Sequence, residues 1–95
     1  MEILAKGRVI SSIATSWGEM AWKIEDALDV LEYFSSQNHL VLGGDILDLN
    51  FEYTYDNWYY NGSSSKGSIS VSEEYLFNFI KNNGKNYYVV FVCEK

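Results

Sequence analysis

The sequence predicts an α+β domain in which a small antiparallel sheet of three to four strands carries helices on one face. Two segments, 16–35 and 70–83, repeat apolar residues at helical spacing. Residues 47–56 alternate apolar and polar side chains, as half-buried strands do, and residues 87–92 form a continuous β-branched and aromatic run typical of a central strand. With 95 residues, 47% of them hydrophobic, we expect one domain, 1–95, with one core.

The first half of the chain is expected to begin with helices. Val9, Ile10, Ile13 and Trp17 are spaced like a short helix. Residues 16–19, Ser-Trp-Gly-Glu, then have the S-x-x-E spacing of a capping box, so an amphipathic helix should start there and end near residues 35–38. Its apolar face would contain Met20, Ile24, Ala27, Leu28, Leu31 and Phe34.

The second half predicts two strands, a helix and a last strand. Residues 40–47, Leu-Val-Leu-Gly-Gly-Asp-Ile-Leu, indicate a buried strand whose glycines mark a bulge or a close backbone approach. A turn at residues 48–50 would make a hairpin with the alternating segment, but the pattern leaves that open. After a polar loop, 62–68, a second S-x-x-E at 70–73 should open a helix with Glu73 and Glu74 in its first turn and Gly84 as its end.

Acidic residues are concentrated in the middle of the chain. The net charge is −6, and eight acids but no Lys or Arg lie between Ile24 and Ser65. If these acids share a face, their field would repel nucleic acid and attract a basic protein. The alternative is that they are scattered over a solvated surface.

No combination of residues indicates catalysis or metal binding. Asp48, Glu52 and Asp56 are four residues apart, which is about 13 Å along an extended chain, too far to share an ion or a proton without a turn. His39, just beyond a helix end, and Cys93, expected as a small core side chain, have no partner base in sequence. We therefore expect no enzymatic activity, no metal and no other cofactor.

The expected cellular location follows from what the sequence lacks. No apolar run is long enough to cross a membrane, and the first ten residues carry Glu2 without the apolar core of a secretory signal. The single cysteine cannot form an internal disulfide. We expect a cytoplasmic protein.

Aromatic side chains next to the acids suggest recognition. Trp58 and Tyr60, with Tyr53, Tyr55 and Tyr59, are residue types enriched at the centres of protein interfaces, although the same residues also make ordinary core and cross-strand pairs.

Several motifs resemble those of the immunity protein 40 family of bacterial polymorphic-toxin systems, which includes immunity proteins of contact-dependent growth inhibition. They are Gly43-Gly44-Asp45 at a strand end, Asn57-Trp58-Tyr59, a helix led by Ser72 with Leu76 and Phe79-Ile80, and the closing apolar strand, over residues 27–92. The resemblance implies a small cytoplasmic protein that binds the C-terminal domain of a cognate toxin and neutralises it without catalysis. Such toxins are often nucleases, whose basic clefts would suit an acidic inhibitor.

We therefore expect an acidic, aromatic surface that occludes a basic toxin domain in a 1:1 complex of two monomers, with no direct contact to nucleic acid or membrane. Glu25, Asp29 and Glu32 could extend this surface. The alternative is an acidic structural or regulatory subunit, including a nucleic-acid mimic, that binds an unrelated basic protein. The expected toxin-binding residues are Asp45, Asp48, Glu52, Asp56, Trp58 and Tyr60.

Overall fold

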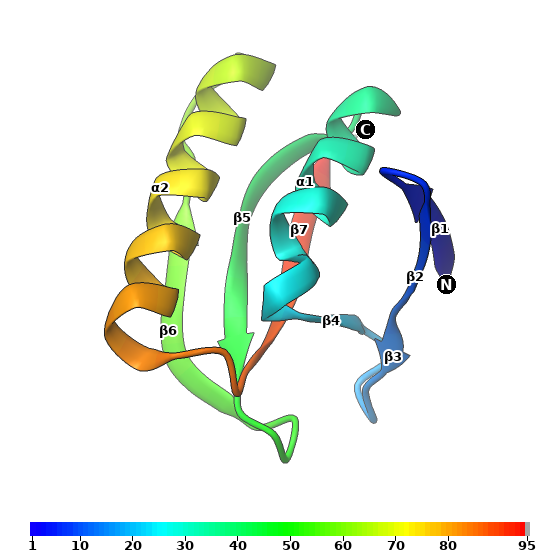
Figure 1. Ribbon diagram of the computed structural model, residues 1–95. Helices are drawn as coiled ribbons and strands as arrows, with labels where there is room; N and C mark the ends of the chain where they lie inside the picture. Colours follow the sequence, from blue (N-terminus) through cyan, green and yellow to red (C-terminus); the bar gives the residue numbers. More distant parts are fainter. Residues whose placement is uncertain (95) are drawn as a thin grey trace.

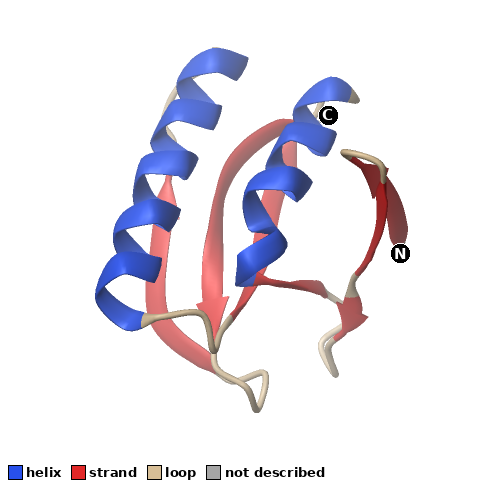
Figure 2. Cartoon of the chain, viewed as in Figure 1, coloured by secondary structure: helices blue, strands red, loops and turns tan. Residues whose placement is uncertain are grey.

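The computed structural model describes residues 1–94. Within them the chain forms strands, two α-helices and one short 3₁₀ turn (Figure 2). In chain order the elements are β1 (Glu2–Ala5), β2 (Arg8–Ser11), β3 (Ile13–Ala14), β4 (Met20–Lys23), the 3₁₀ turn η1 (Ile24–Asp26), α1 (Ala27–Ser36), β5 (Leu40–Leu47), β6 (Tyr53–Tyr59), α2 (Ser65–Asn83) and β7 (Tyr88–Glu94).

A five-stranded sheet is the main layer of the molecule. Its order is β3-β4-β7-β5-β6 and every neighbouring pair is antiparallel, while β1 and β2 form a separate hairpin. Both helices lie on the same side of the large sheet, and the hairpin stands beside α1 (Figure 1). The predicted α+β class with helices on one face is confirmed, as is the central position of the last strand, but the predicted number of strands was too low.

The missing strands come from residues 1–23, where the predicted helices are wrong. Ile3 and Ile10 face each other across the β1–β2 hairpin and are buried, whereas Leu4 and Val9 are exposed. This is the two-residue period of strands. The helical spacing of Val9, Ile10, Ile13 and Trp17 is coincidental, because they belong to two short strands and the turn that follows them.

The predicted capping box at 16–19 is a β-turn that joins β3 to β4. The Thr15 hydroxyl oxygen accepts hydrogen bonds from the amides of Trp17 and Glu19, at 3.3 and 3.1 Å, and Gly18 takes φ +82°. A positive φ is readily adopted by glycine and interrupts a helix. The first α-helix therefore begins at Ala27, after β4 and η1, and its end at Ser36 agrees with the prediction.

Asp48 builds the turn between β5 and β6. Its Oδ1 accepts from the amides of Asn50 and Glu52, at 2.8 and 3.1 Å, and its own amide donates to the Glu52 carbonyl. Asp side chains favour such turns because they satisfy nearby amides. The hairpin that the sequence left open is thus formed.

The second helix starts earlier than predicted. Ser64 is its N-cap, and its hydroxyl accepts from the amide of Gly67 at 3.2 Å, so residues 65–68 belong to the helix rather than to a loop. Glu73 and Glu74 consequently lie in mid-helix instead of the first turn. The predicted end is confirmed, since Gly84 follows the last helical residue with φ +86°.

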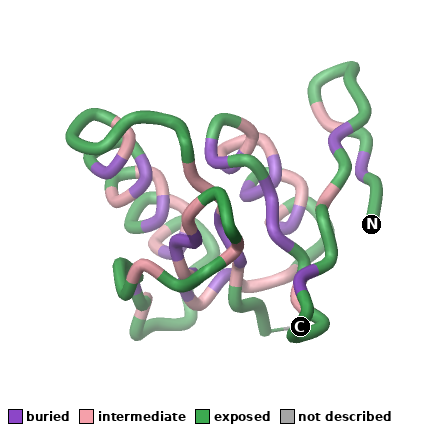
Figure 3. Tube along the Cα trace, turned by 90° about the horizontal axis from the view of Figure 1, so that it is seen from below, coloured by how far each residue is buried: buried purple, intermediate pink, exposed green. Residues whose placement is uncertain are grey.

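The core lies mostly between the helices and the sheet, where buried residues gather (Figure 3). Trp58 on β6 closes the core at the edge of the sheet: its indole N–H donates to the Ser72 hydroxyl of α2 at 2.9 Å. Gly43 and Gly44 let β5 approach this residue, because a Cβ on Gly43 would stand 2.1 Å from the Trp58 carbonyl oxygen and one on Gly44 would meet the indole ring. The predicted close backbone approach at the two glycines is confirmed.

Cys93 is a further correction, since it is exposed and does not belong to the core. It lies in the part of β7 that extends past β4, which pairs only with Tyr88 and Val89. Without a neighbour on that side, the end of the strand stays accessible.

Candidate interaction surface

One face of the large sheet is covered by the helices and the other is not; we call the uncovered side the open face (Figure 1). Ile46 on β5 packs among helix residues, so its neighbours Asp45 and Leu47 point to the open face. Asp45 is opposite Asn57 of β6, and Leu47 is opposite Tyr53. The open face therefore presents acidic, amide and phenolic side chains around a small apolar centre.

A hollow of about 510 Å³ lies on this side of the molecule, between the β3–β4 turn and the β5–β6 turn. Trp17 contributes one wall and is 76% exposed, while Tyr55 on the other wall is 90% exposed. Trp and Tyr are enriched at the centres of protein interfaces, and here two strongly exposed aromatic side chains border the same hollow. The rest of the lining consists of Ala14, Thr15, Ser16, Asn50, Phe51, Glu52 and Tyr53.

Tyr53 connects the two turns that border the hollow. Its hydroxyl donates to Oε1 of Glu19. That bond, followed by burial and by the charges of Glu19 and Asp45, raises the pKa of Tyr53 to about 12. The protonated phenol keeps Glu19 in place.

The carboxylates of the open face are not neutralised. Burial, and then the charge of Glu19, raises the pKa of Asp45. Its side chain makes no hydrogen bond within residues 1–94. Lys23 stands at the β4 end of this face, but no salt bridge in the described chain involves Asp45, Glu19 or Glu52.

The acids of α1 have a different environment. Arg8 of the hairpin lies 2.8 Å from both Asp26 and Asp29, and Lys6 lies 3.2 Å from Asp29 and 3.4 Å from Glu32. The hydrogen bond from Arg8 lowers the pKa of Asp29. These carboxylates hold the hairpin against α1 and are not available as free negative charge.

The six residues expected to bind the toxin do not form one surface. Asp45 lies on the open face and Glu52 lines the hollow, but Asp48 is occupied by the two amides of its turn. Asp56 lies near Tyr75 of α2, because its charge contributes to raising the pKa of that phenol. The four acids thus lie in three places: Asp45 and Glu52 on the open-face side, Asp48 in the β5–β6 turn, and Asp56 on the side of α2.

The two aromatic members of the expected set have structural roles. Trp58 is only 7% exposed and stacks on Tyr75 with ring centroids 4.9 Å apart. Tyr60 is half-buried against Gly62 and Gly67, and its hydroxyl accepts from the amide of Ser64 at 3.2 Å. Tyr60 thus supports the start of α2.

Two residues of the open face were not predicted from the sequence. Trp17 and Glu19 were assigned to a helix start, although Gly18 between them was a signal for a turn. Their place beside Tyr53 depends on pairing between strands far apart in the chain.

Other chemical features can be stated for the described part of the chain. Among residues 1–94, no group of three or more His, Cys, Asp or Glu side chains is placed to hold a metal ion. His39 stacks on Phe34 just after the end of α1. No helix formed by these residues is both long and apolar enough to cross a membrane.

The protein is thus a small α+β domain that, within residues 1–94, presents exposed aromatic side chains and carboxylates without a salt bridge on one face of its sheet. Comparison with protein families is specific: the model of the family described as immunity protein 40 matches residues 10–93. The chain belongs to the immunity protein 40 family. The match begins well before Ala27, so it includes the end of β2 and all of β3 and β4. No curated protein and no solved structure matches the chain.

Proposed function

We propose that the protein is an immunity protein that binds a cognate bacterial toxin domain and neutralises it by occlusion, without catalysis. The observation that carries the proposal is the membership in the immunity protein 40 family. The open face supports it, since exposed aromatic side chains beside unpaired carboxylates are the composition expected of a surface that binds a basic protein.

The proposed toxin-binding surface is the open face around the hollow. Trp17 and Tyr55 supply exposed aromatic area, and Glu19, Asp45 and Glu52 supply negative charge. Trp58 is not part of it, because a partner cannot contact a buried indole. Asp48 and Tyr60 contribute by shaping the β5–β6 turn and the start of α2.

The proposed partner is the basic C-terminal domain of a toxin of the contact-dependent kind, and a nuclease suits the surface best. A nuclease binds polyanionic substrate in a basic cleft, and an acidic surface competes for that cleft. We propose that binding takes place in the cytoplasm and joins one monomer of each protein.

The size of the molecule is compatible with one-to-one occlusion. A standard interface takes about 800 Å² from each partner. The protein has a total accessible surface of 5866 Å². One face is therefore sufficient to cover an active site.

A titration tests the proposal. Toxin activity measured in vitro should fall linearly as the immunity protein is added and reach its end near one equivalent, because occlusion follows occupancy. Activity should return when the complex is denatured and the toxin is refolded alone. Complete inactivation by about a tenth of an equivalent, with the toxin still inactive after separation, would instead show catalytic turnover.

A further inference from the structure

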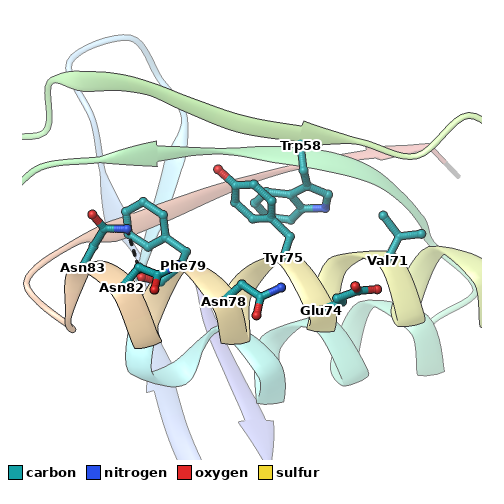
Figure 4. Close-up of a pocket in the computed structure, with 8 residues that line it drawn as sticks. All are labelled: Trp58, Val71, Glu74, Tyr75, Asn78, Phe79, Asn82 and Asn83. Atoms are coloured by element: carbon teal, nitrogen blue, oxygen red, sulfur yellow. Dashed lines mark hydrogen bonds between the residues drawn. The ribbon is translucent and has the colours of Figure 1, made fainter.

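A second hollow, of about 430 Å³, lies between α2 and the edge strand β6, on the helix side of the sheet (Figure 4). Trp58, Tyr75 and Phe79 form its floor, and Glu74, Asn78 and Asn82 project from α2 at its border. We call it the α2–β6 groove. It is separate from the hollow on the open face.

The floor is an aromatic stack with one ring presented to the groove. Figure 4 shows the ring of Tyr75 lying over the indole of Trp58, and the two planes are 24° apart. Phe79 continues the stack, with its ring centroid 6.3 Å from that of Tyr75. Trp58 and Phe79 are each only 7% exposed, so the accessible π surface belongs mainly to half-buried Tyr75.

The polar residues that line the groove are one carboxylate, Glu74, and three asparagines, Asn78, Asn82 and Asn83, whose amides can both donate and accept hydrogen bonds. The indole N–H of Trp58 is already used by the Ser72 hydroxyl. Glu74 is exposed at the border, and Asp56 on β6 is close enough for its charge to act on the Tyr75 phenol. Neither carboxylate takes part in a salt bridge within residues 1–94, and no Lys or Arg is among the residues that line the groove.

A π face bordered by the Glu74 carboxylate and asparagine amides, with the charge of Asp56 acting on the same ring, suits a flat cation. A guanidinium group stacks on an aromatic ring and donates in-plane hydrogen bonds to carboxylates, whereas an ammonium is a compact, strongly hydrated charge. A neutral apolar side chain would gain nothing from the negative charges of Asp56 and Glu74, whereas a cation is attracted by both.

We propose that the α2–β6 groove binds an arginine side chain of the partner protein, stacked on Tyr75 and paired with Glu74 and Asp56. The identification of the partner as a toxin rests on the proposed function, but the chemistry of the groove does not. β6 is the edge strand, so a partner seated on the open face around Tyr55 can reach the groove by passing over that edge.

Nuclear magnetic resonance on the ¹⁵N-labelled protein tests the groove with a defined probe, N-acetyl-arginine methylamide. The indole N–H signal of Trp58 and the amides of α2 near Tyr75 should shift in a saturable manner. The indole signal of Trp22, which is buried, serves as an internal reference, and that of Trp17 reports on the open face. The citrulline analogue has the same shape without the charge and should cause at most a tenth of the shift at equal concentration, by our estimate of about tenfold weaker binding for a neutral group.

Three results would overturn the proposal. Equal shifts with the citrulline and arginine probes would show that charge is not recognised, and equal shifts with the lysine analogue would show that the groove does not select guanidinium. Shifts confined to Trp17 would place the cation on the open face and also contradict it.

Variants that remove one negative charge test whether the groove contributes to binding the partner. Glu74→Gln and Asp56→Asn should each weaken the arginine probe and the toxin about threefold, as expected for one charge beside a cation. Glu73→Gln makes the same charge change on the same helix away from the groove and should have no effect. Circular dichroism checks that each variant is folded.

The outcomes for the groove and for the proposed function are separable. If the wild-type protein binds the toxin and Glu74→Gln binds it equally well, the groove proposal fails while the immunity function stands. If the wild-type protein does not bind the toxin but the arginine probe still shifts Trp58, the immunity function fails and the groove chemistry is supported.

Discussion

At the scale of single residues, two tryptophans show how environment separates stability from binding. Trp58 is buried, stacked on Tyr75 and bonded to Ser72, while Trp17 is 76% exposed beside the open-face hollow. We expect Trp58→Ala to lower the free energy of unfolding by about 3 to 5 kcal/mol, through the cavity it leaves and the unpaired hydroxyl. Urea denaturation followed by circular dichroism measures this loss.

Trp17→Ala is the matched control. We expect it to change the free energy of unfolding by less than about 0.5 kcal/mol, as exposed positions do, and to weaken toxin binding by about 2 kcal/mol. A stable Trp58→Ala protein would mean that the indole does not support the core, and unchanged toxin affinity in Trp17→Ala would remove that residue from the interface.

Asp45 should make stability depend on pH in an uncommon direction. Its pKa is raised above the ordinary 3.8, first by burial and then by Glu19. The folded state therefore holds this proton more tightly than the unfolded state. The resulting stabilisation is complete below the unfolded pKa and is lost as pH rises through the folded pKa. Asp45→Asn should thus be more stable than wild type at pH 7, with the difference vanishing near pH 3.8.

Asp29→Asn provides the opposite sign for comparison. Arg8 lowers the pKa of Asp29, so its stabilisation is present above the ordinary pKa and is lost as pH falls through the folded pKa. The variant should be less stable than wild type at pH 7 and equal to it at low pH. Urea midpoints between about pH 3 and pH 8 measure both differences. Parallel pH profiles for Asp45→Asn and wild type would contradict the assignment.

At the scale of secondary-structure elements, the contact of β5 with β6 depends on glycine. Gly43 has φ +154°, and a Cβ there would overlap the Trp58 carbonyl oxygen. The Gly43→Ala protein must either distort β5 or separate it from β6. We expect a loss of about 4 kcal/mol or more in the free energy of unfolding, measured by urea denaturation.

Gly84→Ala separates backbone strain from this steric overlap. Gly84 also has a positive φ, +86°, but nothing lies within 4 Å of an added Cβ. We expect a loss of only about 1 kcal/mol. Equal losses in the two variants would show that the overlap at Gly43 relaxes easily.

At the scale of the whole molecule, the acids that are clustered in the sequence are not equally available on the surface. Lys6 and Arg8 neutralise the acids of α1, and the carboxylates without a salt bridge include those of the open face. Negative charge on one face accelerates encounter with a basic partner and is screened by salt.

We therefore expect the double variant Glu19→Gln/Glu52→Gln to associate with the toxin about threefold more slowly at low salt and with a flatter dependence on ionic strength. Dissociation should change less. Stopped-flow measurements at several salt concentrations give both rates. The variant Glu2→Gln/Glu73→Gln has the same net charge but retains the open face, so it should keep the wild-type salt dependence. Identical behaviour of the two variants would indicate steering by net charge alone.

Several features of the fold followed from local sequence. The residues 87–92 are so uniformly β-branched and aromatic that only a central strand satisfies them, and β7 lies between β4 and β5. Gly43-Gly44 within an apolar run indicated a close backbone approach, and Gly84 marked the end of α2. These predictions succeeded because each depends on the conformational preference of a few consecutive residues. The family motifs were equally local.

The N-terminal strands and the location of the exposed surface depend on contacts between residues that are distant in the chain. Residues 9–17 fit a helical period, yet their apolar side chains are buried or exposed according to hairpin pairing and contact with α1. Trp58 looked like an interface residue because composition cannot distinguish the two faces of an edge strand. Only the docking of α2 onto β6 made it a core residue, and only the pairing of β4 and β5 with β7 brought Trp17 and Glu19 to the side of the sheet where Tyr53 lies. The sequence alone therefore determined the class of fold and the family, whereas the position of the binding surface depended on tertiary contacts, because burial and electrostatic pairing are properties of side chains brought together from separate segments.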